Sequence, residues 1–178
     1  MTVKESNLQY PSAWHRFGAR MFDFFLFGFV FMMLTDKIIW LRAQPLIYYA
    51  LNMIFVIVSE GYFIHKTNST PGKMFLGLVV VGQKQQAISF KTACYRTFWA
   101  YVKGLWMGIP VMMFVPAWFS RRLYQKTGTT VWDEAAQTKV LQMPSTWFRV
   151  VLFVFIFFLL IFLIGNYHLF QKAFEQGL

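Results

Sequence analysis

The sequence predicts an all-α membrane protein: a helical bundle with three to four transmembrane segments and a small cytoplasmic β-hairpin. Hydrophobic residues form 57% of the 178-residue chain and charged residues only 13%, which is too apolar for a soluble domain of this size. Four apolar runs approach the roughly 20 residues that a helix needs to cross a bilayer. Basic residues gather at the ends of those runs, where the positive-inside bias places them.

The first two apolar runs, residues 21–41 and 45–64, are expected to form a helical hairpin. Basic residues precede the first run and fill the segment after the second. Both of these segments, and the N-terminus with them, are therefore expected to be cytoplasmic. The outer turn then lies at residues 42–45, and Pro45 starts the second helix, where its missing N–H costs nothing.

The third apolar run, residues 97–120, leaves two alternatives open. An excess of basic residues follows it, which favours a run that returns to the side it left. Pro110 and Pro116 would break a helix near its middle, so a re-entrant or strongly kinked pair of half-helices is expected. A single tilted span is the alternative. The last run, residues 147–167, is expected to leave from the cytoplasmic side.

The segment between the second and third runs predicts the small hairpin. Two β-prone stretches, residues 77–81 and 87–90, flank a polar turn at residues 82–86. An amphipathic helix in the membrane interface is disfavoured by the β-branched run and by Gly77 and Gly82. No internal repeat is evident in the sequence.

Other sequence patterns argue against several functions. The net charge of +10 is explained by membrane topology and anionic lipid, so nucleic acid is not an expected partner. Cys94 has no second thiol for a disulfide or a metal site, and the three histidines are dispersed. The TPGK sequence at residues 70–73 lacks the earlier glycine and the following Ser or Thr of a phosphate-binding loop. We expect no catalytic residues, metal or cofactor, and the chain is not expected to be an enzyme.

Ionisable residues gather near the cytoplasmic ends of the predicted spans. On a helix, Arg16 and Arg20 lie towards the face of Asp23, so this carboxylate is expected to face two guanidiniums. Pairing relieves the cost of about 2.5–3.5 kcal/mol for a lone charge at the centre of a transmembrane helix. The cluster is either a structural clamp or a site that exchanges an ion or proton. Its predicted members are Arg16, Arg20, Asp23, Glu60, Arg96 and Asp133.

Several motifs resemble the RDD family of membrane proteins. They are Arg16-x-x-Ala19-x-x-x-Asp23, TPGKMFLGLVVV at residues 70–81, Arg96, and Asp133-x-x-Ala136-x-Thr138-x-Val140. The resemblance covers Pro11 to Leu141. It departs at Gln137, where members usually carry glycine, and in the turn at residues 82–86, where an acidic-Gly turn is usual.

The resemblance implies a multi-pass, mostly bacterial membrane protein, and some members are linked to cation/proton exchange. Residues 1–145 are expected to form the RDD-like membrane domain, and residues 146–178 an additional C-terminal transmembrane helix with a short tail. The family-motif positions are Ala19, Thr70, Gly72, Lys73, Gly77, Ala136 and Thr138.

Two functions are compatible with these patterns. The first is a non-catalytic accessory or scaffold protein of the bacterial inner membrane, which contacts lipid and either a membrane-protein partner or further copies of itself. It is favoured because polar residues are sparse across the spans beyond Asp23 and Glu60. The alternative is a sodium- or potassium-type cation/proton exchanger that uses the same charged residues, with a path built by oligomerisation or by the broken third run.

Overall fold

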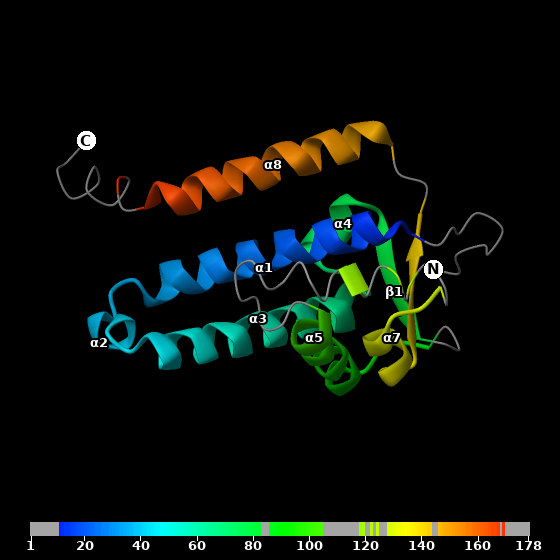
Figure 1. Ribbon diagram of the computed structural model, residues 1–178, viewed down its shortest axis with the longest axis horizontal. Coiled ribbons are helices and arrows are strands. Elements are labelled where there is room, and N and C mark those ends of the chain that lie inside the picture. The colour runs from blue at the N-terminus through cyan, green and yellow to red at the C-terminus, as the bar shows by residue number, and fades with distance from the viewer. Residues whose placement is uncertain are drawn as a thin grey trace.

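The computed structural model describes residues 11–82, 86–104, 118–119, 122, 124, 128–143, 146–167 and 169. Figure 1 shows the long helices side by side, with most of the shorter elements gathered at one end of the bundle. The elements are, in chain order, α1 (Ala13–Thr35), α2 (Ile39–Arg42), α3 (Pro45–Thr67), α4 (Pro71–Phe75), β1 (Leu78–Gly82), α5 (Phe90–Gly104), α7 (Val131–Ala135), β2 (Thr138–Gln142) and α8 (Trp147–Gly165).

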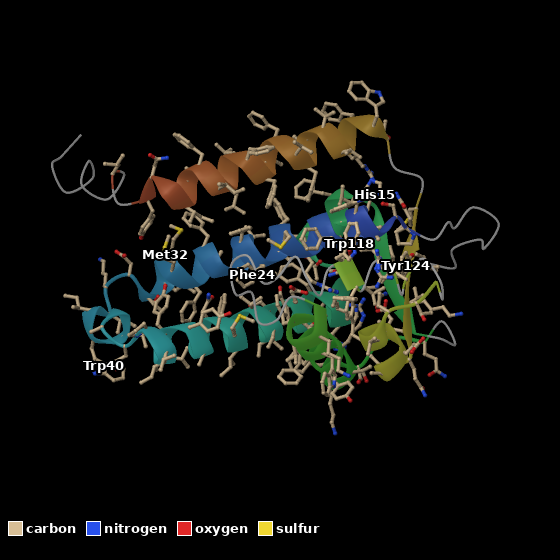
Figure 2. All side chains as sticks on the ribbon, viewed as in Figure 1. His15, Phe24, Met32, Trp40, Trp118 and Tyr124 are labelled. Carbon is tan, nitrogen blue, oxygen red and sulfur yellow. The ribbon has the colours of Figure 1, made fainter. Side chains whose placement is uncertain are left out.

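Among the described residues, α1, α3 and α8 are long and apolar enough to cross a membrane. The predicted all-α membrane fold is therefore confirmed. Ser12 caps α1 by accepting a hydrogen bond from the backbone N–H of His15, and Pro45 occupies the first turn of α3 as predicted. In Figure 2, Trp40 lies at the end of the bundle that carries α2, and His15 and Tyr124 lie at the opposite end. We call that opposite end, with α4, β1, α7 and β2, the charged end.

Aromatic side chains fill the contacts between the long helices. The rings of Phe31 and Phe55 join α1 to α3 with their centroids 5.6 Å apart. Phe22 of α1 lies 5.3 Å from Phe153 of α8, and Phe153 stacks on Phe157. Such ring pairs stabilise helix contacts beyond the area they bury. Most of α8 is nevertheless exposed, as expected for a helix whose outer face contacts lipid.

The two-stranded antiparallel sheet is confirmed, but its second strand is not the predicted one. β1 pairs with β2, and Val80 lies opposite Val140. Residues 87–90 do not form a strand, because Ser89 caps α5: its side chain accepts from the N–H of Thr92, and Phe90 begins the helix. The prediction of a strand at residues 87–90 is therefore wrong. A serine that caps a helix and a serine at the end of a strand look alike in a short apolar stretch.

The structure contains a local repeat that the sequence does not reveal. Residues 68–82 and 128–142 each start with a left-handed residue, continue through a threonine and a five-residue helix, turn at a second left-handed residue and end in a strand. The two strands are β1 and β2 of the sheet. The equivalent pairs, 60 positions apart, are Asn68 and Gly128, Thr70 and Thr130, Gly77 and Gln137.

The predicted break in the third apolar run, at residues 108–110 and Pro116, lies outside the described residues. Within them, α5 packs along α3 so closely that a Cβ at Gly61 would lie 2.4 Å from Sγ of Cys94. The alternatives of a re-entrant pair, a kinked pair and a tilted span all stay predictions.

Candidate functional site

All six predicted charged residues lie together at the charged end, and a seventh joins them. We call this set the charge network. It joins α1, α3, α4, α5 and α7, and every member is buried except Arg16, which is partly buried. Its members are Arg16, Arg20, Asp23, Glu60, Lys73, Arg96 and Asp133.

Asp23 is the point at which α4 is attached to α1. The backbone N–H of Gly72 donates to its Oδ1 at 2.7 Å, and the Thr70 hydroxyl donates to its Oδ2. α4 lies so close to α1 that a Cβ at Gly72 would be 2.3 Å from the carbonyl oxygen of Ala19. Glycine is therefore required at this position, because no side chain fits between the two backbones.

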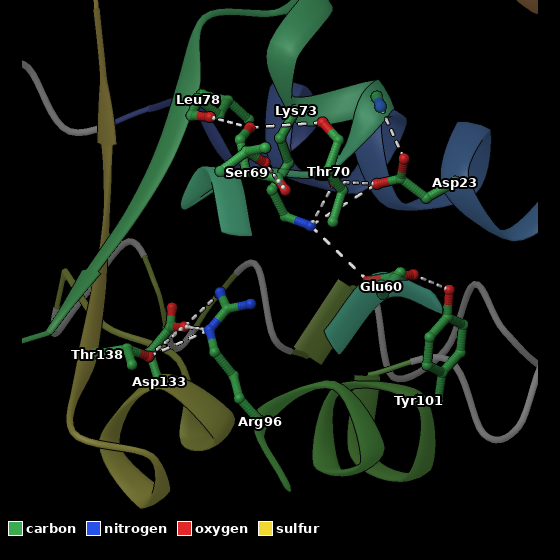
Figure 3. A network of polar contacts seen from close by, with 12 residues as sticks. Asp23, Glu60, Ser69, Thr70, Lys73, Leu78, Arg96, Tyr101, Asp133 and Thr138 are labelled. Atoms are coloured by element: carbon green, nitrogen blue, oxygen red, sulfur yellow. Dashed lines mark hydrogen bonds and ion pairs between the residues drawn. The ribbon is translucent and has the colours of Figure 1, made fainter. Parts of the chain in front are cut away.

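Lys73 lies between two carboxylates. Its Nζ is 3.7 Å from Oδ2 of Asp23 and 3.8 Å from Oε2 of Glu60, and it donates to the hydroxyl of Thr70 at 2.9 Å. Figure 3 shows Lys73 directed between these groups, with Glu60 also accepting from the hydroxyl of Tyr101. Burial lowers the pKa of Lys73, and the two carboxylates oppose that shift.

Asp133 forms the second centre of the network. Arg96 donates from Nε at 2.9 Å and from Nη2 at 2.7 Å to its Oδ1, while Arg16 and Thr130 donate to its Oδ2. Burial alone would raise the pKa of Asp133. The guanidiniums of Arg96 and Arg16 and the Thr130 hydroxyl outweigh burial and hold that pKa well below its usual range.

The predicted pairing of Asp23 with Arg16 and Arg20 is wrong in its partners. Arg16 pairs with Asp133 instead, and its guanidinium also lies over the ring of Tyr124 at 4.8 Å. Arg20 lies over the ring of Trp132 at 4.6 Å. The three side chains do share a face of α1, but segments distant in sequence supply closer partners than the helix itself.

The family-motif positions converge on the same place. Ala19 contacts α4, and Thr70, Gly72 and Lys73 surround Asp23. Thr138 accepts a hydrogen bond from Nε of Arg96 at 3.1 Å. The remaining two positions have backbone roles: Gly77 turns the chain at a φ of 68°, and Ala136 caps the end of α7.

Sequence reasoning missed the roles of Lys73, Tyr101 and Thr130. Lys73 is a motif position in the sequence but is not predicted as a charge partner. A lysine shortly before a buried apolar strand is a signal of pairing with a carboxylate, because a buried charge needs a partner. Thr130 precedes Asp133 as Thr70 precedes Lys73, a parallel that appears only once the repeat is known. No local pattern distinguishes Tyr101 from the other aromatic residues near it.

Metal-binding side chains are not grouped at this site. Across the described ranges, no set of three or more His, Cys, Asp and Glu side chains is placed to hold a metal ion. Every carboxylate of the network takes its hydrogen bonds from protein donors.

Three apolar helices, closed at one end by buried ion pairs, define an integral membrane protein. The model of the RDD family matches residues 10–174, and the chain belongs to that family. The matched residues include α8, beyond the stretch from Pro11 to Leu141 that carries the motifs. Comparisons with curated proteins and with solved structures gave no match.

Proposed function

We propose that this RDD protein is a non-catalytic accessory or scaffold protein of the bacterial inner membrane, with its N-terminus and charged end in the cytoplasm. Its charge network fastens the two short units, α4–β1 and α7–β2, to the ends of the long helices. The fastened units present a fixed surface to a membrane-protein partner or to another copy of the chain.

One observation carries this proposal: two side chains in the N-terminal half of α1 are each tied to a different unit. Asp23 holds α4, and Arg16 holds α7 through Asp133. The strands of the two units then pair with each other, which closes a ring of contacts around the helix ends. Buried ion pairs whose carboxylates accept hydrogen bonds from protein donors favour one fixed arrangement, which suits a structural clamp.

The polar groups farther along the helices also favour a scaffold over a pathway. The hydroxyl of Thr35 donates to the carbonyl of Phe31 in its own helix at 2.8 Å. Lys103 is exposed and lies over the ring of Trp99 at 4.4 Å. Asn52 and Thr97 each carry a buried oxygen without a hydrogen bond to a described residue, and two such groups do not span a bilayer.

The exposed surface of the charged end is basic. This favours anionic lipid headgroups and an acidic partner surface, because opposite charges steer association. The exposed basic side chains there are His65, Lys66, Lys91, Lys139 and Arg149.

The proposal is tested with Asp23→Asn in cells. We expect lower abundance of the protein and lower recovery of whatever is cross-linked to the wild type in native membranes, because the amide no longer pairs with Lys73. Glu134→Gln, which removes an exposed carboxylate of α7, is the matched control and should change neither quantity. Wild-type abundance together with wild-type recovery for Asp23→Asn would contradict the proposal.

A cation/proton exchanger is the second candidate, and Lys73 is the observation that favours it. Its ammonium lies between Asp23 and Glu60, the position that a monovalent cation would take if the lysine gave up its proton. Under this alternative, Asp23→Asn abolishes cation-dependent proton movement while the protein level stays normal. The two candidates therefore differ in the abundance they predict for Asp23→Asn: lower under the scaffold proposal and normal under the exchanger.

A further inference from the structure

Arg20 differs from the other cations of the charge network, because no described acceptor takes a hydrogen bond from it. Its side chain is only 7% exposed, and Nε is completely buried without a partner. The contact with the ring of Trp132 engages the face of the guanidinium and does not occupy the Nε–H donor, which lies in the guanidinium plane. A guanidinium keeps its charge under all ordinary conditions, so this unpaired donor belongs to a buried cation.

The charges around Arg20 do not balance within the described residues. The charge network contains four cations and three carboxylates, which leaves one positive charge. Asp23 and Asp133 are occupied by Lys73 and by the other two arginines. Glu60 attracts Arg20 through space, but its oxygens already contact Tyr101 and Lys73. A buried charge without a partner is strongly unfavourable, so a counter-charge is required.

One further donor beside Arg20 has no described acceptor. Nε1 of Trp132, the ring on which Arg20 stacks, is buried and unpaired in the part of the chain that the structure describes. A Cβ at Gly104 would be 3.2 Å from Nη1 of Arg20 and 2.9 Å from the Trp132 ring. The absence of a side chain at Gly104 therefore lets the stacked pair lie directly against the backbone of α5.

We propose that Arg20, with Trp132, binds a small monovalent anion of the size of chloride. The anion supplies the missing negative charge and accepts hydrogen bonds from two donors, Nε of Arg20 and Nε1 of Trp132, that have no acceptor among the described residues. A water molecule would satisfy the same donors but would leave the charge unbalanced. This inference does not depend on the scaffold proposal, since a bound anion stabilises the charged end whether or not the protein transports an ion.

The test measures the unfolding temperature of the purified full-length protein in detergent micelles. Sodium concentration, pH and ionic strength are held constant while gluconate, a much larger anion, is replaced by chloride. We expect a saturable rise in Tm with chloride and with nitrate, of about 5–10 °C when the anion exceeds its Kd by about a hundredfold. Equal Tm values in chloride and gluconate would overturn the proposal.

Two variants assign the effect to this site. Arg20→Gln removes the charge and should abolish the chloride dependence. Arg122→Gln is the matched control: Arg122 also lies over an indole, that of Trp118 at 5.5 Å, but it is exposed, and its substitution should leave the dependence intact. A chloride effect that persists in Arg20→Gln would also overturn the assignment.

A direct measurement covers the case in which Arg20→Gln fails to fold. The line width of the chloride-35 NMR signal reports binding to the wild-type protein alone. We expect the protein to broaden the chloride signal, added nitrate to reverse the broadening, and added gluconate to leave it unchanged. A line width that the protein leaves unchanged would exclude the site.

Discussion

Asp133 shows at the scale of single residues how the buried charges are accommodated. Its two oxygens accept from Arg16 of α1, from Arg96 of α5 and from Thr130 beside it. Charge-assisted hydrogen bonds of this kind are stronger than neutral ones, and removing one partner of a buried pair leaves the others uncompensated. The carboxylate is therefore a local centre of stability.

Asp133→Asn should lower the free energy of unfolding by about 3–5 kcal/mol, because two buried guanidiniums lose their counter-charge. The measurement is unfolding of the purified protein in denaturant, followed by circular dichroism. Glu134→Gln is the control, since the neighbouring carboxylate is exposed and accepts a hydrogen bond from Thr129. A loss of less than about 1 kcal/mol for Asp133→Asn would show that the ion pairs are not essential.

The same carboxylate predicts a pH dependence. Its pKa is lower in the folded than in the unfolded protein, so its contribution is complete above the unfolded value of about 4 and is lost as the pH falls below it. We expect wild-type stability to decline from about pH 4 downwards, and the decline to be shallower in Asp133→Asn. An equally steep decline of stability at acid pH in the two proteins would contradict this assignment.

At the scale of elements, the two short units, α4–β1 and α7–β2, have the same backbone arrangement of a five-residue helix followed by a strand. At equivalent positions in their helices, the first unit carries Lys73 and the second carries Asp133. Each therefore requires opposite charges from the long helices, and Asp23 and Arg16 of α1 provide one of each. Opposite signs prevent the units from exchanging places, because each would then face a like charge.

Gly72→Ala should release the first unit from α1. The added Cβ would lie 2.3 Å from the carbonyl oxygen of Ala19, and the clash is between backbones that cannot both shift without breaking the bond to Asp23. We expect a loss of about 3 kcal/mol or more in unfolding free energy and poor accumulation in membranes. Gly165→Ala is the control, because nothing lies within 4 Å of its added Cβ. Equal abundance of the two variants would argue against the close contact.

A pair of cysteines tests the sheet. In a Cys94→Ser background, Val79→Cys and Leu141→Cys occupy paired positions of β1 and β2 and should form a disulfide under mild oxidation. Val79→Cys with Ser89→Cys, which would face each other only in a hairpin of neighbouring segments, should not. The expected readout is a mobility shift on non-reducing gels. Cross-linking of the second pair alone would contradict the β1–β2 pairing and support the hairpin that the sequence predicted.

At the scale of the whole molecule, the sequence predicted what depends on local composition. The spans α1, α3 and α8 follow from hydropathy, and the charged residues at their ends follow from the cost of burying a charge in a bilayer. The pairing of those charges could not be predicted, because Arg16 and Asp133 meet only after the chain has folded. A helix-face argument pairs neighbours in sequence, and here tertiary contacts override it.

The sheet and the repeat escaped prediction for a related reason. β1 pairs with a strand 60 positions later, so no turn signal connects them. The repeated units have similar backbones but different side chains, and Gln137 occupies the left-handed position that Gly77 fills in the first unit. Glycine is favoured at such a φ, which explains physically why the family usually carries it where this chain has Gln137.

The central claim is that the charge network is a clamp and not a path for ions, and proton movement in liposomes tests it most directly. Purified wild-type protein is reconstituted, gradients of sodium, lithium or potassium are imposed, and internal pH is followed, with Asp23→Asn and Asp133→Asn alongside. We predict no cation-dependent change of pH with folded wild-type protein. Cation-dependent proton movement that is lost in a folded variant would contradict the clamp and would make the network the site of an exchanger.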